Sequence, residues 1–343
     1  MSVKTRIVAG VALLLICMSG AAAYLWFSGA RGAVKLAAAE KRQCRVDTAD
    51  ATDPHAGMVY VPGGKFTLGD TVYPEEGPIK TVEVSGFWMD RHEVTNRQFK
   101  AFVDATDYVT VAERPVDAAR HPGLPSEMLK PGSVVFIMPN DVNGMGDVTQ
   151  WWRYVPGANW RHPGGPDTSI EGFADFPVVD LAFEDILAYA KWKGHDIPTE
   201  AQWEWAARGG QAEAARDHDQ PADANTWQGI FPVQNSAADG FVGLAPAGCY
   251  KPNAYGLHDM VGNAWEWTKD LYQPNHDGAG GVDPAGPPEG FHPDAGDVDR
   301  HVIKGGSYLC APNYCMRYRA GSRQPQEADL GTSHVGFRTV RKE

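Results

Sequence analysis

The chain has 343 residues and a formal net charge of -12, with 43% hydrophobic and 22% charged residues. These fractions are typical of a globular protein and exclude a disordered or fibrous chain. No run of basic residues lies outside the N-terminal region, so the sequence predicts no nucleic-acid partner. The 38 Gly, 25 Pro and 11 Trp residues favour a loop-rich fold over a helix bundle.

The N-terminal region is predicted to be a signal anchor or a signal peptide over residues 1–27. Lys4 and Arg6 precede an uncharged stretch at residues 7–27, which is long enough to span a bilayer as a helix. A retained anchor, with the membrane as a partner, and a cleaved signal both fit this pattern. Either predicts an exported body, membrane-anchored outside the cytoplasm (periplasmic in a bacterium) or secreted. Residues 28–54 are rich in Ala and charge, and we interpret them as a tether.

The folded body is expected over residues 55–343, beginning with two strands. Alternating apolar residues, followed by a Pro-Gly-Gly turn, predict the first strand at residues 58–61. A second strand is predicted at residues 82–89. Residues 109–176 hold few periodic runs and many Pro, Gly and Trp, which is typical of a long functional loop or of one held by partner groups.

Three helices are predicted from apolar spacing and capping residues. Thr95 is expected to cap the first helix, which would bury Phe99 and Phe102. The second helix is expected at residues 183–193, and the third is expected to begin after Thr199. With no linker or repeat visible, the sequence predicts a single α+β domain with extensive ordered loops.

The cysteines offer the clearest chemical signal in the sequence. Cys310 and Cys315 are separated by four residues, so they can close a small disulfide loop, hold a soft metal, or react with a substrate thiol. Export favours the disulfide. Cys17 lies in the apolar stretch, where membrane packing or signal removal explains it. Cys44 and Cys249 are isolated in the sequence, and we expect neither to form a disulfide.

Six segments of the body together carry a family resemblance. They are WMDRHEVTNRQF (88–99), GANWRHP (157–163), PTEAQWEWAARGG (198–210), YGLHDMVGNAWEW (255–267), GGSYLCAPNYCMRYR (305–319) and VGFR (335–338). On these motifs, roughly residues 57–341 resemble the sulfatase-modifying factor family. The cysteine pair within Gly-Gly-Ser-Tyr-x-Cys-x4-Cys makes the chain similar to the formylglycine-generating enzymes of that family.

The resemblance implies a compact, loop-rich fold related to C-type lectin-like modules, and an oxidase activity. The substrate would be the cysteine of a Cys-x-Pro-x-Arg motif in an unfolded or nascent sulfatase, converted to Cα-formylglycine with O₂ and Cu(I). Cu(I) is a soft ion that favours thiolates, so Cys310 and Cys315 are its expected ligands. The alternatives are a non-catalytic lectin-like binding module and a family member with other oxidative chemistry. The His-x3-His-x-Glu pattern of iron-dependent relatives does not occur here.

The resemblance also implies active-site neighbours of the cysteine pair. Ser307 is expected to hydrogen-bond a thiol or an oxygen species, and Trp265 to exclude water, although core packing equally explains a tryptophan. Tyr314 and Arg323 are expected to line the peptide groove. His334 stands where the family usually has Asn; an imidazole can replace the amide hydrogen bond, but it can also take up a proton or bind metal.

Ca²⁺ is the second cofactor that the resemblance implies, because carboxylates and backbone carbonyls occur where the family binds it. The expected ligands of one ion are Asn225, Thr226, Asp239 and Phe241. The expected ligands of the other are Asp259, Gly262, Ala264 and Glu266. Loop caps and turns are the alternative explanation of these residues.

Exported members of the family often carry further disulfides. Ala190 and Ala320 occupy places where such cysteines occur. We therefore expect packing and metals, rather than disulfides, to stabilise this body.

Overall fold

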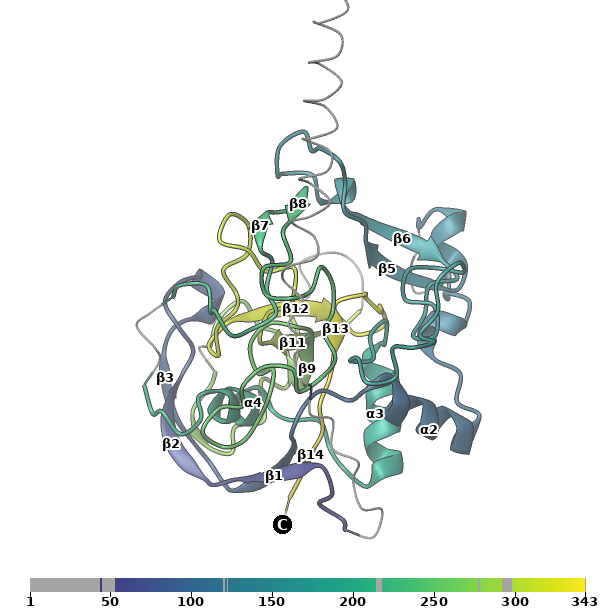
Figure 1. Cartoon of the computed structure of the whole chain (residues 1–343). Coiled ribbons are helices and arrows are strands. Elements are labelled where there is room, and N and C mark those ends of the chain that lie inside the picture. The colour runs from purple at the N-terminus through teal and green to yellow at the C-terminus, as the bar shows by residue number, and fades with distance from the viewer. Residues whose placement is uncertain are drawn as a thin grey trace, which may run out of the picture. The chain divides into compact units, whose positions relative to one another are not determined.

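The computed structural model describes Cys44 and residues 53–119, 121, 123–213, 218–276, 278–291 and 298–342. They belong to one compact unit that begins at Cys44 (Figure 1). The expected anchor or signal at residues 1–27 lies outside the described residues, as does most of the expected tether. Within the described part of the chain, no helix combines the length and apolar character needed to cross a membrane.

A four-stranded sheet lies at the centre of the body (Figure 1). Its strands are β9 (Trp265–Leu271), β11 (Arg300–Lys304), β12 (Arg323–Glu327) and β13 (Val335–Gly336), in the order β12-β11-β9-β13. The neighbours of β11 are antiparallel to it, whereas β13 runs parallel to β9. Most residues of β9 and β11 are buried, so this sheet is the buried centre against which the loops pack.

Smaller sheets surround the central one. β1 (Met58–Val61), β4 (Phe87–Asp90) and β14 (Val340–Arg341) form one; β2 (Gly64–Leu68), β3 (Lys80–Val84) and β10 (Gly281–Val282) form another. β5 (Gly132–Phe136) pairs with β6 (Trp152–Pro156), and β7 (Gly229–Ile230) pairs with β8 (Gln234–Asn235). The 3₁₀ turns are η1 (Pro74–Glu76), η2 (Val111–Glu113), η3 (Ser126–Leu129) and η4 (Val148–Gln150).

The strand at residues 58–61 is confirmed, but the single strand predicted at residues 82–89 is wrong. The chain breaks it at Ser85-Gly86 into β3 and β4, which pair with different partners, β2 and β1. At Gly86 an added Cβ would lie 2.1 Å from the Tyr60 hydroxyl. The glycine therefore permits the close approach at which the chain passes from one sheet to the other.

All three predicted helices are confirmed. They are α2 (Asn96–Thr106), α3 (Phe183–Lys193) and α4 (Glu200–Ala207). Thr95 Oγ1 accepts the Gln98 backbone N–H at 3.3 Å, and Thr199 Oγ1 accepts that of Gln202 at 3.1 Å. These caps satisfy N–H groups that would otherwise lack partners in the first turn.

The stretch 109–176 is more regular than predicted, because it contains the β5–β6 pair and three 3₁₀ turns. Trp151 and Trp160 of this stretch are fully buried. A main core cluster joins α2 and α3 to β9, with Phe99, Tyr189 and Trp265 among its members, and it also contains both Cys310 and Cys315. The fold thus places the two thiols within its main core.

Candidate active site

Two consecutive glycines direct the chain from β11 into the cysteine segment. Gly305 and Gly306 have φ angles of +95° and +76°, a region that favours glycine. A Cβ on Gly306 would lie 2.5 Å from the backbone oxygen of Arg317, and one on Gly305 would lie 3.0 Å from the ring of Trp203. The glycines therefore allow the segment to fold back against its own continuation at Arg317.

Two backbone turns bring the thiols together. The Cys310 N–H donates to Ser307 O at 2.9 Å, and the Cys315 N–H donates to Ala311 O at 2.9 Å. The sulfurs lie 3.1 Å apart, and neither thiol is in a disulfide in the described structure. The residues are 1% and 7% exposed. The predicted convergence of the two thiols is thus confirmed in a reduced, buried pair.

The two thiols have different pKa values. The hydrogen bond from the Cys310 thiol lowers the pKa of Cys315 to about 7, and the neighbouring guanidinium of Arg317 acts in the same direction. Burial, together with the neighbouring Cys315 sulfur, raises the pKa of Cys310 well above its ordinary value. Cys315 is therefore the more acidic thiol of the pair, and the thiolate form of a cysteine is both the nucleophile and the metal ligand.

Trp265 and Ser307 both lie beside the pair in the fold. Trp265 is 1% exposed and packs in the same cluster as both cysteines. Ser307 is fully buried; its Oγ accepts the Leu309 N–H at 3.3 Å, and its carbonyl holds the turn at Cys310. Its burial in this cluster agrees with core packing, and its role in keeping water from the sulfurs stays a prediction.

Tyr314 lies at an aromatic surface next to the pair. Its ring stacks on Phe231, with centroids 4.3 Å apart, and meets Trp151 edge-on at 5.7 Å. Tyr314 is 37% exposed, whereas Phe231 and Trp151 are buried. Tyr314 is therefore an accessible aromatic residue one position before Cys315, where a bound peptide can contact it.

Residues 44–343 match the profile of the sulfatase-modifying factor enzyme 1-like domain. The chain belongs to this family. It is 47% identical over 293 residues to the formylglycine-generating enzyme of Mycobacterium tuberculosis, covering 82% of this chain and 97% of that one. It is 40% identical over 295 residues to the Bos taurus formylglycine-generating enzyme, covering 83% and 74%.

A solved structure also resembles the fold. PvdO from Pseudomonas aeruginosa superposes with a TM-score of 0.54 at 22% identity, covering 88% of this chain and 99% of that one. At this identity the likeness concerns the fold alone, and it agrees with the predicted mixture of helices and sheets in one body. The expected relation to C-type lectin-like folds stays a prediction.

Arg323, the second family residue expected in the peptide groove, lies in a buried ionic cluster. Its Nε and Nη2 donate to the two carboxylate oxygens of Glu200 at 2.8 and 3.0 Å, and Nη1 donates to the carbonyls of Glu75 and Gln273. Arg323 is 2% exposed. The structure therefore does not place its guanidinium beside the sulfurs, and its contact with a peptide stays a prediction.

His334, which replaces the usual Asn of the family, lies between β9 and the aromatic surface. Its carbonyl accepts the Trp265 N–H at 2.9 Å, and its ring lies 4.6 Å from that of Trp152. Its Nδ1 is buried and has no hydrogen-bond partner among the described residues. Burial lowers the pKa of His334 to about 3, so the ring is neutral at physiological pH.

The first set of expected calcium residues forms a closed loop. Asp239 accepts the backbone N–H groups of Thr226 at 3.0 Å and of Phe241 at 3.2 Å. Asn225 donates to Asn263 Oδ1 at 3.0 Å. The residues are thus brought together as predicted, and the hydrogen bonds of Asp239 match its alternative role as a loop cap. A carboxylate oxygen has further lone pairs with which to bind a cation.

Asp259 and Glu266 of the second set are also brought together, and a third buried carboxylate, Glu93, lies near them. Glu266 forms a two-point ion pair with Arg338, with both distances 2.7 Å. Asp259 is 6% exposed, and burial raises its pKa to about 6. Glu93, which is fully buried, is held against this group by Asn263 Nδ2 at 2.9 Å. Glu93 stands in one of the family motifs, but a single Glu before a helix carries no further sequence signal.

The expectation that Cys44 and Cys249 form no disulfide is wrong, because the two residues are bonded to each other. Their sequence separation of 205 hid the pairing. Cys249 packs with Phe241 and Tyr250, and the Tyr250 hydroxyl donates to Asp239 O at 3.1 Å. A disulfide therefore contributes to this body, contrary to the expectation of packing and metals alone, and it fixes one point of the segment 28–54 to the loops expected to bind calcium.

The electrostatic surroundings of Cys315 were not predicted from the sequence. Arg317 contacts Glu75 and stacks over Tyr73, whose hydroxyl accepts the Met316 N–H at 3.1 Å. Glu75 and Tyr73 come from η1 and its N-terminal end, more than 200 residues away. No local sequence pattern identifies such a pairing, although the arginine itself lies two residues after the cysteine.

Proposed function

We propose that this chain is a formylglycine-generating oxidase. It converts the cysteine of a Cys-x-Pro-x-Arg motif in an unfolded or nascent sulfatase polypeptide to Cα-formylglycine. The observation that carries the proposal is the buried pair of free thiols, 3.1 Å apart, in a chain whose relatives are named formylglycine-generating enzymes.

The chemistry balances with dioxygen and a thiol reductant. The substrate CH₂–SH group loses two electrons and two protons to give a thioaldehyde, and water then replaces sulfur, so that an aldehyde and H₂S leave. Dioxygen takes four electrons in its reduction to two waters, two from the substrate and two from two thiols that form a disulfide. The net requirement is therefore one O₂ and two reductant thiols for each formylglycine.

The donor set at the pair fits Cu(I). Cys310 and Cys315 supply two soft sulfur ligands in an apolar, buried place, and soft thiolates select Cu(I). The lowered pKa of Cys315 favours metal binding at neutral pH, because the ligand must be deprotonated. When bound, copper supplies affinity for the substrate thiolate and activation of O₂.

The remaining site residues bind the peptide, orient the cysteine pair and shield it from water. Tyr314 offers an exposed ring next to Cys315 for contact with the peptide. Trp265 covers the sulfurs from the core side and keeps water away from them. Ser307 holds the turn that presents Cys310. His334, neutral at physiological pH, acts as a hydrogen-bonding or packing group and not as an acid. Arg323 supports the peptide-binding surface through the hydrogen bond that its Nη1 donates to the Glu75 carbonyl.

Two Ca²⁺ ions are proposed as structural cofactors, at the Asp239 and Asp259 loops. In the described structure no three His, Cys, Asp or Glu side chains converge on one metal position. Each ion would therefore take few carboxylates and complete its shell with backbone carbonyls and water, as Ca²⁺ accepts. The Asp259 Oδ1 atom supports the fit, because it is buried and meets no donor among residues that the structure describes.

We further propose that the protein is exported, with residues 1–27 as a signal anchor or signal peptide and the body outside the cytoplasm. The Cys44–Cys249 disulfide supports this location, because disulfides persist in oxidising compartments. A reporter fused after Glu343 tests the topology: activity of a reporter that works only in the cytoplasm would contradict it.

Mass spectrometry of a Cys-x-Pro-x-Arg peptide tests the catalytic proposal. The peptide is incubated in air with copper-loaded protein and a thiol reductant, and its conversion to formylglycine is expected. Cys315→Ser should abolish turnover, because only one of the two thiolate ligands is then left and it cannot hold the metal alone. A matched control, Ser85→Ala, changes an exposed hydroxyl bonded to Asp283 and should leave turnover unchanged. Peptide that binds to the wild type yet keeps its mass would favour a binding module.

A further inference from the structure

The β7–β8 hairpin lies against the cysteine loop, residues 310–315. The Trp227 N–H, at the base of the hairpin, donates to the Cys310 carbonyl at 3.0 Å. Four residues later, the ring of Phe231 stacks on the ring of Tyr314, with an angle of 8° between the two planes. The hairpin therefore runs alongside the cysteine loop from Cys310 to Tyr314.

Asn313, which lies between the two cysteines, joins the hairpin to this loop with both polar groups of its side chain. Its Oδ1 accepts the Phe231 N–H at 3.3 Å, and its Nδ2 donates to the Phe231 carbonyl at 3.1 Å. One amide thus satisfies both main-chain groups of Phe231, as a neighbouring residue does in an antiparallel strand pair. Phe231 is 1% exposed, and buried main-chain groups are costly to leave without partners. Asn313 therefore stabilises the docked position of the hairpin.

The hairpin is too small to keep this position by itself. β7 and β8 have two residues each, and an isolated two-stranded hairpin is marginally stable in water. Inside the hairpin, the Val233 N–H donates to the Ile230 carbonyl at 3.0 Å, and the Ser236 N–H donates to the Gln228 carbonyl at 2.7 Å. These bonds close the hairpin but do not set its orientation. The contacts with the cysteine loop therefore determine where the hairpin lies.

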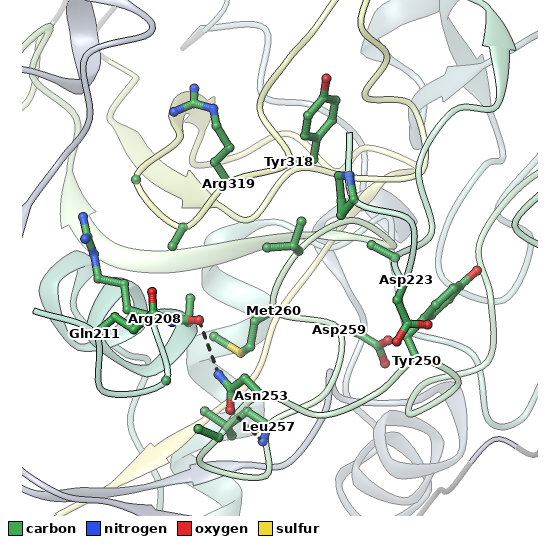
Figure 2. Close-up of a pocket in the computed structure, with 18 of the residues that line it drawn as sticks. Arg208, Gln211, Asp223, Tyr250, Asn253, Leu257, Asp259, Met260, Tyr318 and Arg319 are labelled. Carbon is green, nitrogen blue, oxygen red and sulfur yellow. Dashed lines mark hydrogen bonds between the residues drawn. The ribbon is translucent and has the colours of Figure 1, made fainter. Parts of the chain in front are cut away.

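The chain that follows the cysteine pair is held by different contacts, at the wall of a pocket of about 500 Å³. Figure 2 shows Tyr318 and Arg319 on this wall. Arg319 pairs with Asp70 and Glu76, and its Nε donates to the Met316 carbonyl at 2.9 Å. These ion pairs fix the chain after the cysteine loop, whereas the hairpin contacts the loop itself.

The position of the sulfurs does not depend on Asn313. Each cysteine N–H is held by a backbone hydrogen bond of 2.9 Å within its own turn, and Asn313 takes part in neither bond. Asn313 is exposed, whereas both thiols are buried. A substitution at Asn313 should therefore change the hairpin and the surroundings of Tyr314, and leave the two sulfur ligands in place.

We propose that Asn313 is a positioning residue for the substrate peptide: by holding Phe231, it makes the β7–β8 hairpin the second side of the peptide-binding surface, next to Tyr314. Tyr314 and Ile230 are 37% and 59% exposed, so this surface presents large apolar side chains to solvent. An unfolded polypeptide exposes apolar side chains that such a surface can bury. The inference rests on the proposed function and adds to it the residue that fixes the peptide-binding surface relative to the sulfurs.

The test compares wild type with Asn313→Ala, both loaded with copper. The KM of a Cys-x-Pro-x-Arg peptide is expected to rise roughly five- to tenfold, as for the loss of one net hydrogen bond. The kcat should stay within about twofold of wild type, because a change in KM alone marks the loss of uniform substrate binding. Hydrogen exchange at the Phe231 N–H should become faster, because its acceptor is removed.

Two further variants separate this role from a general effect on the hairpin. Asn313→Gln keeps both amide groups on a longer side chain and should restore part of the peptide affinity. Asn235→Ala changes a matched asparagine of the same hairpin, whose side chain bonds the backbone of Ala237 and Val242 and not the cysteine loop. It should keep the wild-type KM.

The outcomes distinguish the two proposals. An unchanged KM together with unchanged Phe231 exchange in Asn313→Ala would overturn the positioning role, and so would a loss of Cu(I) affinity, which would assign Asn313 to the metal site. A wild type that converts no peptide would overturn the proposed function instead. The dissociation constant of the peptide and the Phe231 exchange rate, both measured without turnover, would then still decide the role of Asn313.

Discussion

Arg317 stacks on the ring of Tyr73, with 3.9 Å between the guanidinium carbon and the ring centre. Tyr73 also accepts the Met316 N–H, and Glu75 pairs with the Arg317 guanidinium. One short turn, η1, therefore holds both the backbone and the charge beside Cys315. Because Arg317 is restrained in this way, its positive charge stays near the thiol whose pKa is lowered to about 7.

Arg317→Met is expected to raise the pKa of Cys315, because removing a neighbouring cation disfavours the thiolate. The rate of Cys315 alkylation in reduced, metal-free protein should fall roughly three- to tenfold at pH 7, and its pH midpoint should move upward. Arg317→Lys should restore part of the effect, and Arg97→Met, at an exposed ion pair, should have none. An unchanged midpoint in Arg317→Met would show that the Cys310 hydrogen bond alone lowers the pKa.

Asp180→Asn is expected to stabilise the protein at pH 8 but not at pH 4. Burial raises the pKa of Asp180 to about 8, whereas an unfolded Asp has a pKa of about 3.9. The folded state therefore binds the proton more tightly, and wild-type stability is lost as the pH rises from about 4 to about 8. Asn keeps the Ser133 hydrogen bond and tolerates the φ of +61°.

The measurement is denaturant unfolding of both proteins across this pH range. At pH 8 the variant should gain roughly 1–3 kcal/mol in the free energy of unfolding. Near pH 4 the two proteins should be nearly equal, because the carboxyl is then protonated in the folded wild type. A parallel pair of stability curves, with no divergence as pH rises, would show that Asp180 stays ionised.

Removal of the disulfide by Cys44→Ser with Cys249→Ser is expected to lower the free energy of unfolding by about 2–4 kcal/mol. The bond closes a loop of 205 residues, and constraint of the unfolded chain is one source of such stabilisation. Reductant should lower the wild-type thermal midpoint and leave the double variant unchanged. Free thiols can be counted in the full-length wild type after denaturation without reductant. The bond would be contradicted if all four of these cysteines then reacted as free thiols: Cys44, Cys249, Cys310 and Cys315.

The elements of this fold that could be predicted are those determined by residues close together in the sequence. The capping residues Thr95 and Thr199 and the apolar spacing of the helices identified α2, α3 and α4, and the spacing of the two cysteines near residue 310 indicated that their thiols can meet. The Cys44–Cys249 bond, the Glu93–Asn263 contact and the Tyr73–Arg317 stack each join segments far apart in the chain. Such contacts depend on the tertiary fold, and no periodicity encodes them.

His334→Asn is expected to leave the pH profile of formylglycine formation unchanged above pH 5. Burial lowers the pKa of His334 to about 3, so the ring is neutral over this range and an amide replaces its hydrogen-bonding capacity. The same shift makes folding sensitive to acid. An unfolded His has a pKa of about 6.5, so the unfolded state takes up a proton that the folded state refuses, and stability is lost as the pH falls below about 6.5.

The variant should therefore lose less stability than wild type between pH 6.5 and pH 4, as measured by thermal midpoints, and should match it at pH 8. His121→Asn is a suitable control, because that ring contacts Asp329 at the partly exposed surface. A shift of the activity profile near pH 6 in His334→Asn would mean that the imidazole titrates during turnover. The ring would then act in the reaction as an acid or base, and not as a replacement for the amide that the family usually carries.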